Sequence, residues 1–292
     1  MQNADITDPI FHQAVEAIDG GDAVLLQKLI TDNPRLITDR LSTTEEGYFK
    51  DPYLLWFVAD NPIRHEKLPA NIVAIINLLV TEVKAKAPGI AQQQLDYTLG
   101  LVATGRIPRE SGMQIAMMDA LINAGAQPGG GMGALAHGNT EAANYLIERG
   151  GKITLGVAMG LQRMPDINRL LQTATTDEKL AALTAVSFYG KADMVKFLLE
   201  QGVDPNGYPN PESGFHSHAT PLHQAVFAGS LETVKLLVES GARLDAPDKI
   251  YDGTPLGWAE YAPSEGGDEA ILQTFTEIGN YLRSVANHNA DG

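Results

Sequence analysis

Two histidines one residue apart, His216 and His218, are the side chains in this sequence with the clearest capacity for chemistry. An imidazole exchanges protons near neutral pH, and a carboxylate such as Glu260 can act with it as acid or base. The guanidinium of Arg106 is suited to hold an anionic group of a substrate. One alternative for the chain is therefore an atypical small-molecule-binding protein or hydrolase, with a pocket of His, Glu and Tyr side chains around residues 215–260.

The spacing of the two histidines also fits two ligands on one metal ion. A zinc site needs a third and usually a fourth ligand, however, and the chain contains no cysteine. The sequence therefore predicts no metal site, no cofactor and no catalytic residue. The loop at 208–218 has two other interpretations: a partner-contacting loop that presents Phe215, His216 and His218, or an ordinary solvated loop.

The elements that must position these side chains are clearest at residues 219–242, which have the pattern of two helices joined by a turn. Thr220 can cap a helix through its hydroxyl, and Pro221 suits the first helical position because a missing N–H costs nothing there. Gly229 permits the left-handed turn that ends the first helix, and Gly241 ends the second. Apolar residues recur at three- and four-residue spacing in the second helix: Leu231, Val234, Leu237 and Val238. Such a hairpin is stable only between similar neighbours.

The Thr-Pro-Leu-His sequence at 220–223, followed by Gly229 and by Gly-Ala at 241–242, resembles the ankyrin repeat. The resemblance is strongest over residues 183–261 and degenerate elsewhere. It implies an all-α fold, an ankyrin-like solenoid of about eight stacked helix-turn-helix units, several of them degenerate. The family's usual activity, recognition of proteins without catalysis, is the function that this resemblance implies.

Weaker copies of the pattern extend over the rest of the chain. His-Gln-Ala-Val occurs at residues 12–15 and again at 223–226, in the same place before a glycine turn. The glycines that would close successive units, Gly125, Gly150, Gly202 and Gly241, are 25, 52 and 39 residues apart. Since 52 is twice 26, a further unit is expected to close near residue 176, although no glycine marks its end.

We expect these units to form one elongated domain over residues 1–292. Its parts are a capping repeat at 1–40, an inserted polar loop at 41–50, short degenerate repeats at 51–176, well-formed repeats at 177–261 and a C-terminal capping helix at 262–287. At the start of the degenerate region, Asp51 and Pro52 predict the cap and first turn of a helix.

An aromatic side chain recurs at one position of the best units. Phe188, Phe227 and Tyr261 each lie five residues after a first-helix leucine, and the same alignment pairs Trp258 with Gln224. The family resemblance implies that these positions face a concave groove, where exposed aromatic rings are typical binding anchors. The alternative is that a bent stack buries them as core.

Two other motifs are explained without a ligand. Arg106 and Arg109 have the chemistry to grip an anion, but in an acidic protein we favour their pairing with nearby carboxylates. The glycine run at 129–136 matches Gly-x-Gly-x-x-Ala, the pattern of a dinucleotide-binding loop. That loop needs a preceding strand, whereas a helix is expected to end at Gly125, so we interpret the run as a helix-to-helix turn.

The composition limits the class of partner. Thirty-six acidic and 21 basic side chains give a net charge of −15, which repels nucleic acid and anionic membranes and attracts a basic protein surface. The longest apolar run, at 72–80, is too short for a membrane span. No secretory signal is visible, and without cysteine the chain forms no disulfide. We expect a cytoplasmic monomer.

Together these features favour a non-catalytic protein–protein interaction module over an enzyme. We expect it to bind another protein, and neither nucleic acid nor a membrane, through the concave face and loops of its C-terminal half. The predicted partner-binding residues are Phe188, Phe215, His216, His218, Gln224, Phe227, Tyr251, Trp258, Glu260 and Tyr261.

Overall fold

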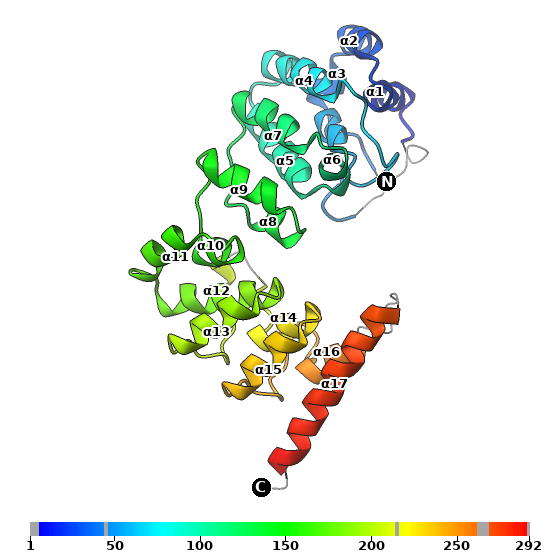
Figure 1. The fold of residues 1–292 in the computed structure, drawn as a ribbon. Coiled ribbons are helices and arrows are strands. Elements are labelled where there is room, and N and C mark those ends of the chain that lie inside the picture. The colour runs from blue at the N-terminus through cyan, green and yellow to red at the C-terminus, as the bar shows by residue number, and fades with distance from the viewer. Residues whose placement is uncertain (1–5, 44–45, 214–215, 262–268, 291–292) are drawn as a thin grey trace. The chain divides into compact units, whose positions relative to one another are not determined.

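The computed structural model of the chain describes residues 6–43, 46–213, 216–261 and 269–290 (Figure 1). These ranges contain helices joined by turns and loops, and no strand. The chain divides into two compact units, Met1–Lys152 and Ile153–Gly292. In the part that the structure describes, the protein is therefore all-α.

The N-terminal unit is built from pairs of a first and a second helix. The first helices are α1 (Pro9–Gly20), the 3₁₀ helix η2 (Leu54–Ala59), α5 (Ala91–Thr104) and α8 (Met132–Ala136). The second helices are α2 (Ala23–Asp32), α4 (Ile72–Lys86), α7 (Gln114–Asn123) and α9 (Thr140–Glu148). Two short helices, α3 (Arg35–Thr38) and α6 (Arg106–Glu110), lie in the connections. Neighbouring first helices pack on one another in chain order, and so do neighbouring second helices.

The C-terminal unit repeats this arrangement (Figure 1). Its first helices are α10 (Leu155–Gly160), α12 (Thr176–Phe188), α14 (Pro221–Phe227) and α16 (Pro255–Tyr261). Its second helices are α11 (Met164–Leu171), α13 (Ala192–Glu200), α15 (Leu231–Glu239) and α17 (Glu269–Ala290). A 3₁₀ turn, η3 (Pro211–Ser213), lies in the long loop before α14. The first helices pack in the order α10, α12, α14, α16, and the second helices α13, α15, α17 pack beside one another.

Eight helix pairs in the described ranges confirm the predicted ankyrin-like helical solenoid. The unit expected to close near residue 176 is present as α10 and α11, and it has no closing glycine. Within each unit, a helix pair contacts mainly the pairs before and after it, as a stacked array requires. The grouping of all pairs into one elongated domain with a cap at each end stays a prediction.

The apolar spacing of the sequence explains how the pairs hold together. Leu222 and Val226 of α14 and Val234 and Leu237 of α15 are all fully buried in one cluster that continues into the neighbouring pairs. Burying a side chain of this size stabilises the fold by about 1.5–3 kcal/mol. The cluster is therefore shared between repeats, and no pair has a separate core.

Polar side chains fix the starts of several helices. At α12 the N–H of Glu178 donates to the hydroxyl of Thr175 (3.2 Å), and the N–H of Thr175 donates to the Glu178 carboxylate (2.8 Å). At α1 the carboxylate of Asp8 accepts hydrogen bonds from the N–H groups of Ile10 and Phe11, both at 3.0 Å. These bonds satisfy N–H groups that a helix leaves free at its first turn.

The start of the second pair differs from the sequence prediction. Asp51 does not cap a helix, because its backbone is left-handed (φ 45°) and its carboxylate accepts a hydrogen bond from the N–H of Thr43 (2.9 Å). The first helix of this pair is η2, which begins at Leu54 and has no side-chain cap. Asp51 therefore closes the loop that precedes η2, and it does not start the helix.

The described part of the predicted insertion at 41–50 packs on the core through an apolar side chain as well as making polar contacts. It contains no helix, as expected, but Phe49 is buried and its ring lies 5.2 Å from that of Phe57 in η2. The ring of Phe49 thus attaches this polar loop to the core.

The glycines at 129–131 form the turn before α8, as predicted, whereas residues 132–136 are α8 itself, and the turn allows a close backbone approach. A Cβ atom at Gly151 would lie 2.2 Å from the carbonyl oxygen of Gly129, and one at Gly130 would lie 2.7 Å from that of Lys152. Both separations are shorter than real side chains tolerate. The packing of two loops therefore explains these glycines without a bound phosphate.

Replacement of Gly151 by Ala is expected to destabilise the N-terminal unit by about 1–3 kcal/mol, because the new methyl group collides with a backbone oxygen. Gly89→Ala is the matched control, since a Cβ there meets nothing within 4 Å. Urea unfolding followed by circular dichroism compares the two variants. Equal midpoints for both would contradict the close approach.

Candidate functional site

Five rings in the C-terminal unit form a continuous series, the ring ladder: Phe227, Phe188, His216, His218 and Trp258. The centroid of the Phe188 ring lies 5.5 Å from that of Phe227 and 5.0 Å from that of His216, with interplanar angles of 12° and 28°. The series continues to His218 at 5.7 Å and to Trp258 at 6.1 Å. Rings at such separations attract each other, so the loop that carries the histidines is held against the helices.

Adjacent first helices bring the phenylalanines together. Phe188 ends α12, Phe227 ends α14, and these two helices pack side by side. Phe188 is half-buried, whereas the side chain of Phe227 is 59% exposed. Tyr261 occupies the equivalent place at the end of α16 and is also exposed. The alignment predicted from the sequence thus places three aromatic residues at the same end of successive first helices.

Trp258 is less available than the sequence suggests. Its indole Nε1 donates a hydrogen bond to Oδ2 of Asp248 (3.0 Å), and its ring meets that of His223 edge-on at 4.9 Å. The side chain is half-buried and packs against the apolar cluster of the unit. For Trp258 the core interpretation is correct, because a hydrogen-bonded indole is part of the framework rather than an open anchor.

A buried carboxylate organises the loop beside Trp258. Oδ1 of Asp248 accepts the N–H groups of Ile250 (2.9 Å) and Tyr251 (2.7 Å), and Oδ2 accepts that of Gly253 (2.9 Å) and the indole N–H. Burial acts to raise the pKa of Asp248, but the hydrogen bonds from Tyr251, Trp258 and the other donors outweigh it and lower the pKa to about 2. The loop is therefore closed around a permanent negative charge.

This closed loop presents two large apolar side chains to solvent. Ile250 is 59% exposed and Tyr251 is 82% exposed, although the backbone of both residues is tied to Asp248. We call these two residues the apolar tip. An exposed ring on a fixed backbone loses little conformational freedom when it contacts another surface.

His223 joins the ladder to the next helix pair. The N–H of Thr220 donates to Nδ1 of His223 (3.3 Å), and Nε2 lies 2.9 Å from the carbonyl oxygen of Gly253. An accepting Nδ1 places the proton on Nε2, so one neutral tautomer satisfies both contacts. Burial lowers the pKa of His223, and burial together with the neighbouring His218 lowers that of His216.

Gln224 is the predicted site residue that the structure hides most completely. Its side chain is 1% exposed, and neither Oε1 nor Nε2 has a hydrogen-bond partner among the described residues. It lies one turn before Phe227 on the same face of α14. A buried amide with no partner is uncommon in folded proteins and calls for an explanation.

The residues of the enzymatic alternative are engaged elsewhere. Glu260 was predicted as a carboxylate near the histidines, but its Oε1 accepts two hydrogen bonds from Arg283 of α17, at 2.8 and 3.2 Å. Arg106 lies in the N-terminal unit and pairs with Glu66 (3.1 Å) and Glu110 (3.0 Å). The favoured pairing with carboxylates is therefore correct for Arg106, and Glu260 is not a free acid or base.

In the part of the chain that is described, the other residues singled out from the sequence do not form a catalytic or metal site either. Phe215 lies outside the described residues. Arg109 donates to the side-chain oxygen of Asn139 (2.6 Å) and also lies 3.8 Å from the Glu110 carboxylate, in line with the predicted pairing. Within the described ranges, no three histidine or acidic side chains are grouped closely enough to hold a metal ion. The ring ladder and the apolar tip are thus the features that a functional assignment must explain.

Comparison with known proteins agrees with this architecture. The family model of ankyrin repeats matches residues 131–248 in three copies. Residues 131–248 are ankyrin repeats. They run from the turn before α8 to the buried Asp248, and so include four of the five ladder rings. Ankyrin repeats generally mediate protein–protein interaction. The family match therefore indicates this class of function.

Individual relatives match the chain less completely. The potassium channel GORK of Arabidopsis thaliana is 30% identical over 96 residues, which are 33% of this chain and 10% of that protein. The chain thus spans about a tenth of the length of this curated relative. The crystal structure of the human ASB11 ankyrin repeat domain is 22% identical and has a TM-score of 0.33. The match covers 67% of this chain and 92% of that domain.

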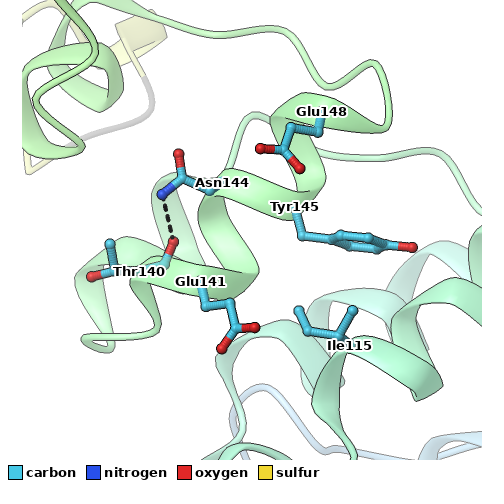
Figure 2. A pocket seen from close by; sticks show the side chains of 6 residues that line it. All are labelled: Ile115, Thr140, Glu141, Asn144, Tyr145 and Glu148. Atoms are coloured by element: carbon cyan, nitrogen blue, oxygen red, sulfur yellow. Dashed lines mark hydrogen bonds between the residues drawn. The ribbon is translucent and has the colours of Figure 1, made fainter.

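A shallow groove that the sequence did not indicate lies between α7 and α9. Helix α9 is the second helix of its pair and belongs to the ankyrin-repeat region. The volume of the groove is about 570 Å³, and Figure 2 shows Glu141, Tyr145 and Glu148 extending from α9 beside Ile115 of α7. Thr140 and Asn144 complete the lining. Residues three, four and seven positions apart share one helix face, so Glu141, Asn144, Tyr145 and Glu148 line the same side of α9.

Among the described helices, none combines the length and the apolarity that a membrane crossing requires.

Acidification is expected to destabilise the ankyrin-repeat region below pH 6.5. The folded chain lowers the pKa of His223, whereas the unfolded chain keeps the ordinary value of about 6.5, so the unfolded state binds more protons as the pH falls. The free energy of unfolding therefore falls between pH 7.5 and 5.5, by at most about 1.4 kcal/mol per pH unit for this histidine. Urea titrations at several pH values measure the slope. His223→Gln should reduce the slope, with the remainder due to His216, whose pKa the fold also lowers, and an unchanged slope would contradict the assignment.

Asp248→Asn is expected to lower the free energy of unfolding by about 1–3 kcal/mol, because an amide NH₂ would face N–H donors that now have an acceptor. Asp252→Asn is the control, since Asp252 is exposed and its left-handed backbone suits asparagine. Thermal unfolding by circular dichroism compares the variants. An equal melting temperature for both would show that the carboxylate does not organise the loop.

Proposed function

We propose that this chain is a non-catalytic, cytoplasmic protein-binding module whose partner contacts Phe188 and Phe227 of the ring ladder and the apolar tip of the C-terminal unit. The observation that carries the proposal is the stacked pair of Phe188 and Phe227, in which the second ring is 59% exposed although its neighbour is held in place. Exposed aromatic rings in fixed positions are the residues that contribute most to protein interfaces.

The apolar tip adds a second contact of the same kind. Tyr251 and Ile250 project from a loop whose backbone is bonded to the buried Asp248. Because the loop is already ordered, binding loses little of the entropy that a mobile loop would lose. Tyrosine also supplies both an apolar ring and a hydroxyl, a combination common in recognition surfaces.

Charge favours a basic partner surface. The net charge of −15 attracts positively charged proteins over a distance of about 10 Å at moderate ionic strength. Attraction of this kind speeds encounter more than it strengthens the final contact. The partner's affinity would therefore depend on the rings, and its association rate on salt.

A catalytic function has less support. Glu260 accepts hydrogen bonds from Arg283, and Asp248 has four donors around its carboxylate. Neither is available as an acid or base next to His216 and His218. In a binding role, the two histidines contribute ring contacts and no proton transfer.

Replacement of Phe227 by Ala is expected to reduce partner capture at least about 30-fold, as loss of an interface hot spot does, while the melting temperature changes by no more than a few degrees. Affinity capture from cytosolic extract of the native cell, with mass spectrometry, identifies the partner, and titration with the purified partner measures the loss. Val24→Ala is the matched control, because Val24 is 83% exposed and lies in the other unit.

Two outcomes would contradict the proposal. If the captured protein binds the Phe227→Ala variant and the parent chain equally tightly, then its binding does not depend on the ladder. A large fall in melting temperature would show that the ring belongs to the core. Trp258→Ala is unsuitable for this test, because its indole is bonded to Asp248 and its loss would disturb the fold.

A further inference from the structure

Two rings of the ladder come from the loop before α14 and not from a helix. His216 lies against Phe188 of α12, and His218 lies beside Trp258 of α16. Helix α14 packs between α12 and α16. Residues 216–218 therefore cross α14 on the side where a partner would have to contact the helices in the proposed function.

One face of α14, the helix that lies between the two ring contacts of this segment, contains an unsatisfied amide. Gln224 and Phe227 are one turn apart on this face, and both polar atoms of the Gln224 side chain are buried without a hydrogen-bond partner in the described ranges. The segment thus supplies rings to the site but does not satisfy the amide. A glutamine side chain both donates and accepts, so it can pair with the N–H and C=O of a peptide backbone.

The segment is also strained where it meets the ladder. His216 has a φ of 25°, a left-handed conformation that costs free energy in a residue other than glycine. The carbonyl of His218 is fixed by the N–H of Lys249 (2.8 Å), so one end of the segment is anchored while the other is strained. Release of His216 from Phe188 would relieve this strain.

We propose that residues 216–218 are a built-in occupant of the partner site. The incoming ligand is an extended peptide segment of the partner whose backbone pairs with the Gln224 amide and whose ring side chains replace the two imidazoles. This inference rests on the proposed function and names its ligand class. Since the two occupants compete for one site, weakening the resident segment increases the affinity for the incoming one.

The probe for this competition is a synthetic peptide of residues 209–219, with capped ends, added to the full chain. All proteins carry Trp56→Phe, so that the emission of Trp258 reports binding next to His218. The peptide is expected to bind the double variant His216→Gly, His218→Gly at least about tenfold more tightly than it binds the parent. A control peptide with glycine at both histidine positions should not bind.

Gln224→Leu, made in the double variant, tests the role of the amide. Loss of a buried amide that has no partner should raise the melting temperature, while loss of backbone pairing should weaken peptide binding at least about tenfold. A merely structural glutamine would not combine higher stability with weaker binding. Equal peptide affinity for the parent and the double variant, or an unchanged affinity in Gln224→Leu, would overturn the inference.

Circular dichroism establishes that the double variant is folded, and His216→Gly alone replaces it if it is not. The peptide test is separable from partner capture. Peptide binding with the expected pattern supports the resident segment even if Phe227→Ala still captures the partner, in which case the proposed function fails. Capture that depends on Phe227, together with no effect of the histidine variants on peptide affinity, supports the proposed function and refutes the resident segment.

Discussion

Each helix pair in this chain buries its apolar faces only against the pairs beside it, and this constraint determines the rest of the structure. Leu222 and Val234 come from one pair, yet the cluster that buries them continues into the pairs before and after. Because neighbouring pairs must pack in the same orientation, equivalent positions of successive first helices lie next to one another. The contact of Phe188 with Phe227 is a direct result of that stacking.

Where the stacking leaves loops exposed, polar contacts replace apolar ones. Asp248 gathers three backbone N–H groups and the indole of Trp258 around one carboxylate, and His223 joins α14 to the carbonyl of Gly253. A pKa of about 2 keeps the carboxylate charged near neutral pH, where it accepts the hydrogen bonds that close the loop. The apolar tip and the Trp258 end of the ladder both depend on this arrangement, since neither is held by a helix alone.

Features that depend on local spacing were predictable from the sequence, and features that depend on tertiary partners were not. The helix pairs, the degenerate unit near residue 176 and the alignment of Phe188 with Phe227 follow from periodicity and turn residues. Trp258 was expected in an open groove, because its hydrogen bond to a residue ten positions earlier leaves no periodic trace. For the same reason the sequence did not indicate the ion-pair partner of Glu260, which is Arg283 of α17. An aspartate followed by a turn ending in glycine, as at 248–253, does indicate backbone bonding, and this feature could have been used.

The bond from His223 to the carbonyl of Gly253 has a practical consequence for dividing the chain. A fragment that stops after the closing Gly241 would retain α14 and α15 complete, yet it would leave the imidazole N–H without its acceptor and would expose the side of α14 that α16 covers. The boundary suggested by counting repeats is therefore misplaced for recombinant work. The shortest fragment that keeps α14 in its native surroundings has to continue through α16 and through α17 at least to Arg283, which pairs with Glu260 of α16.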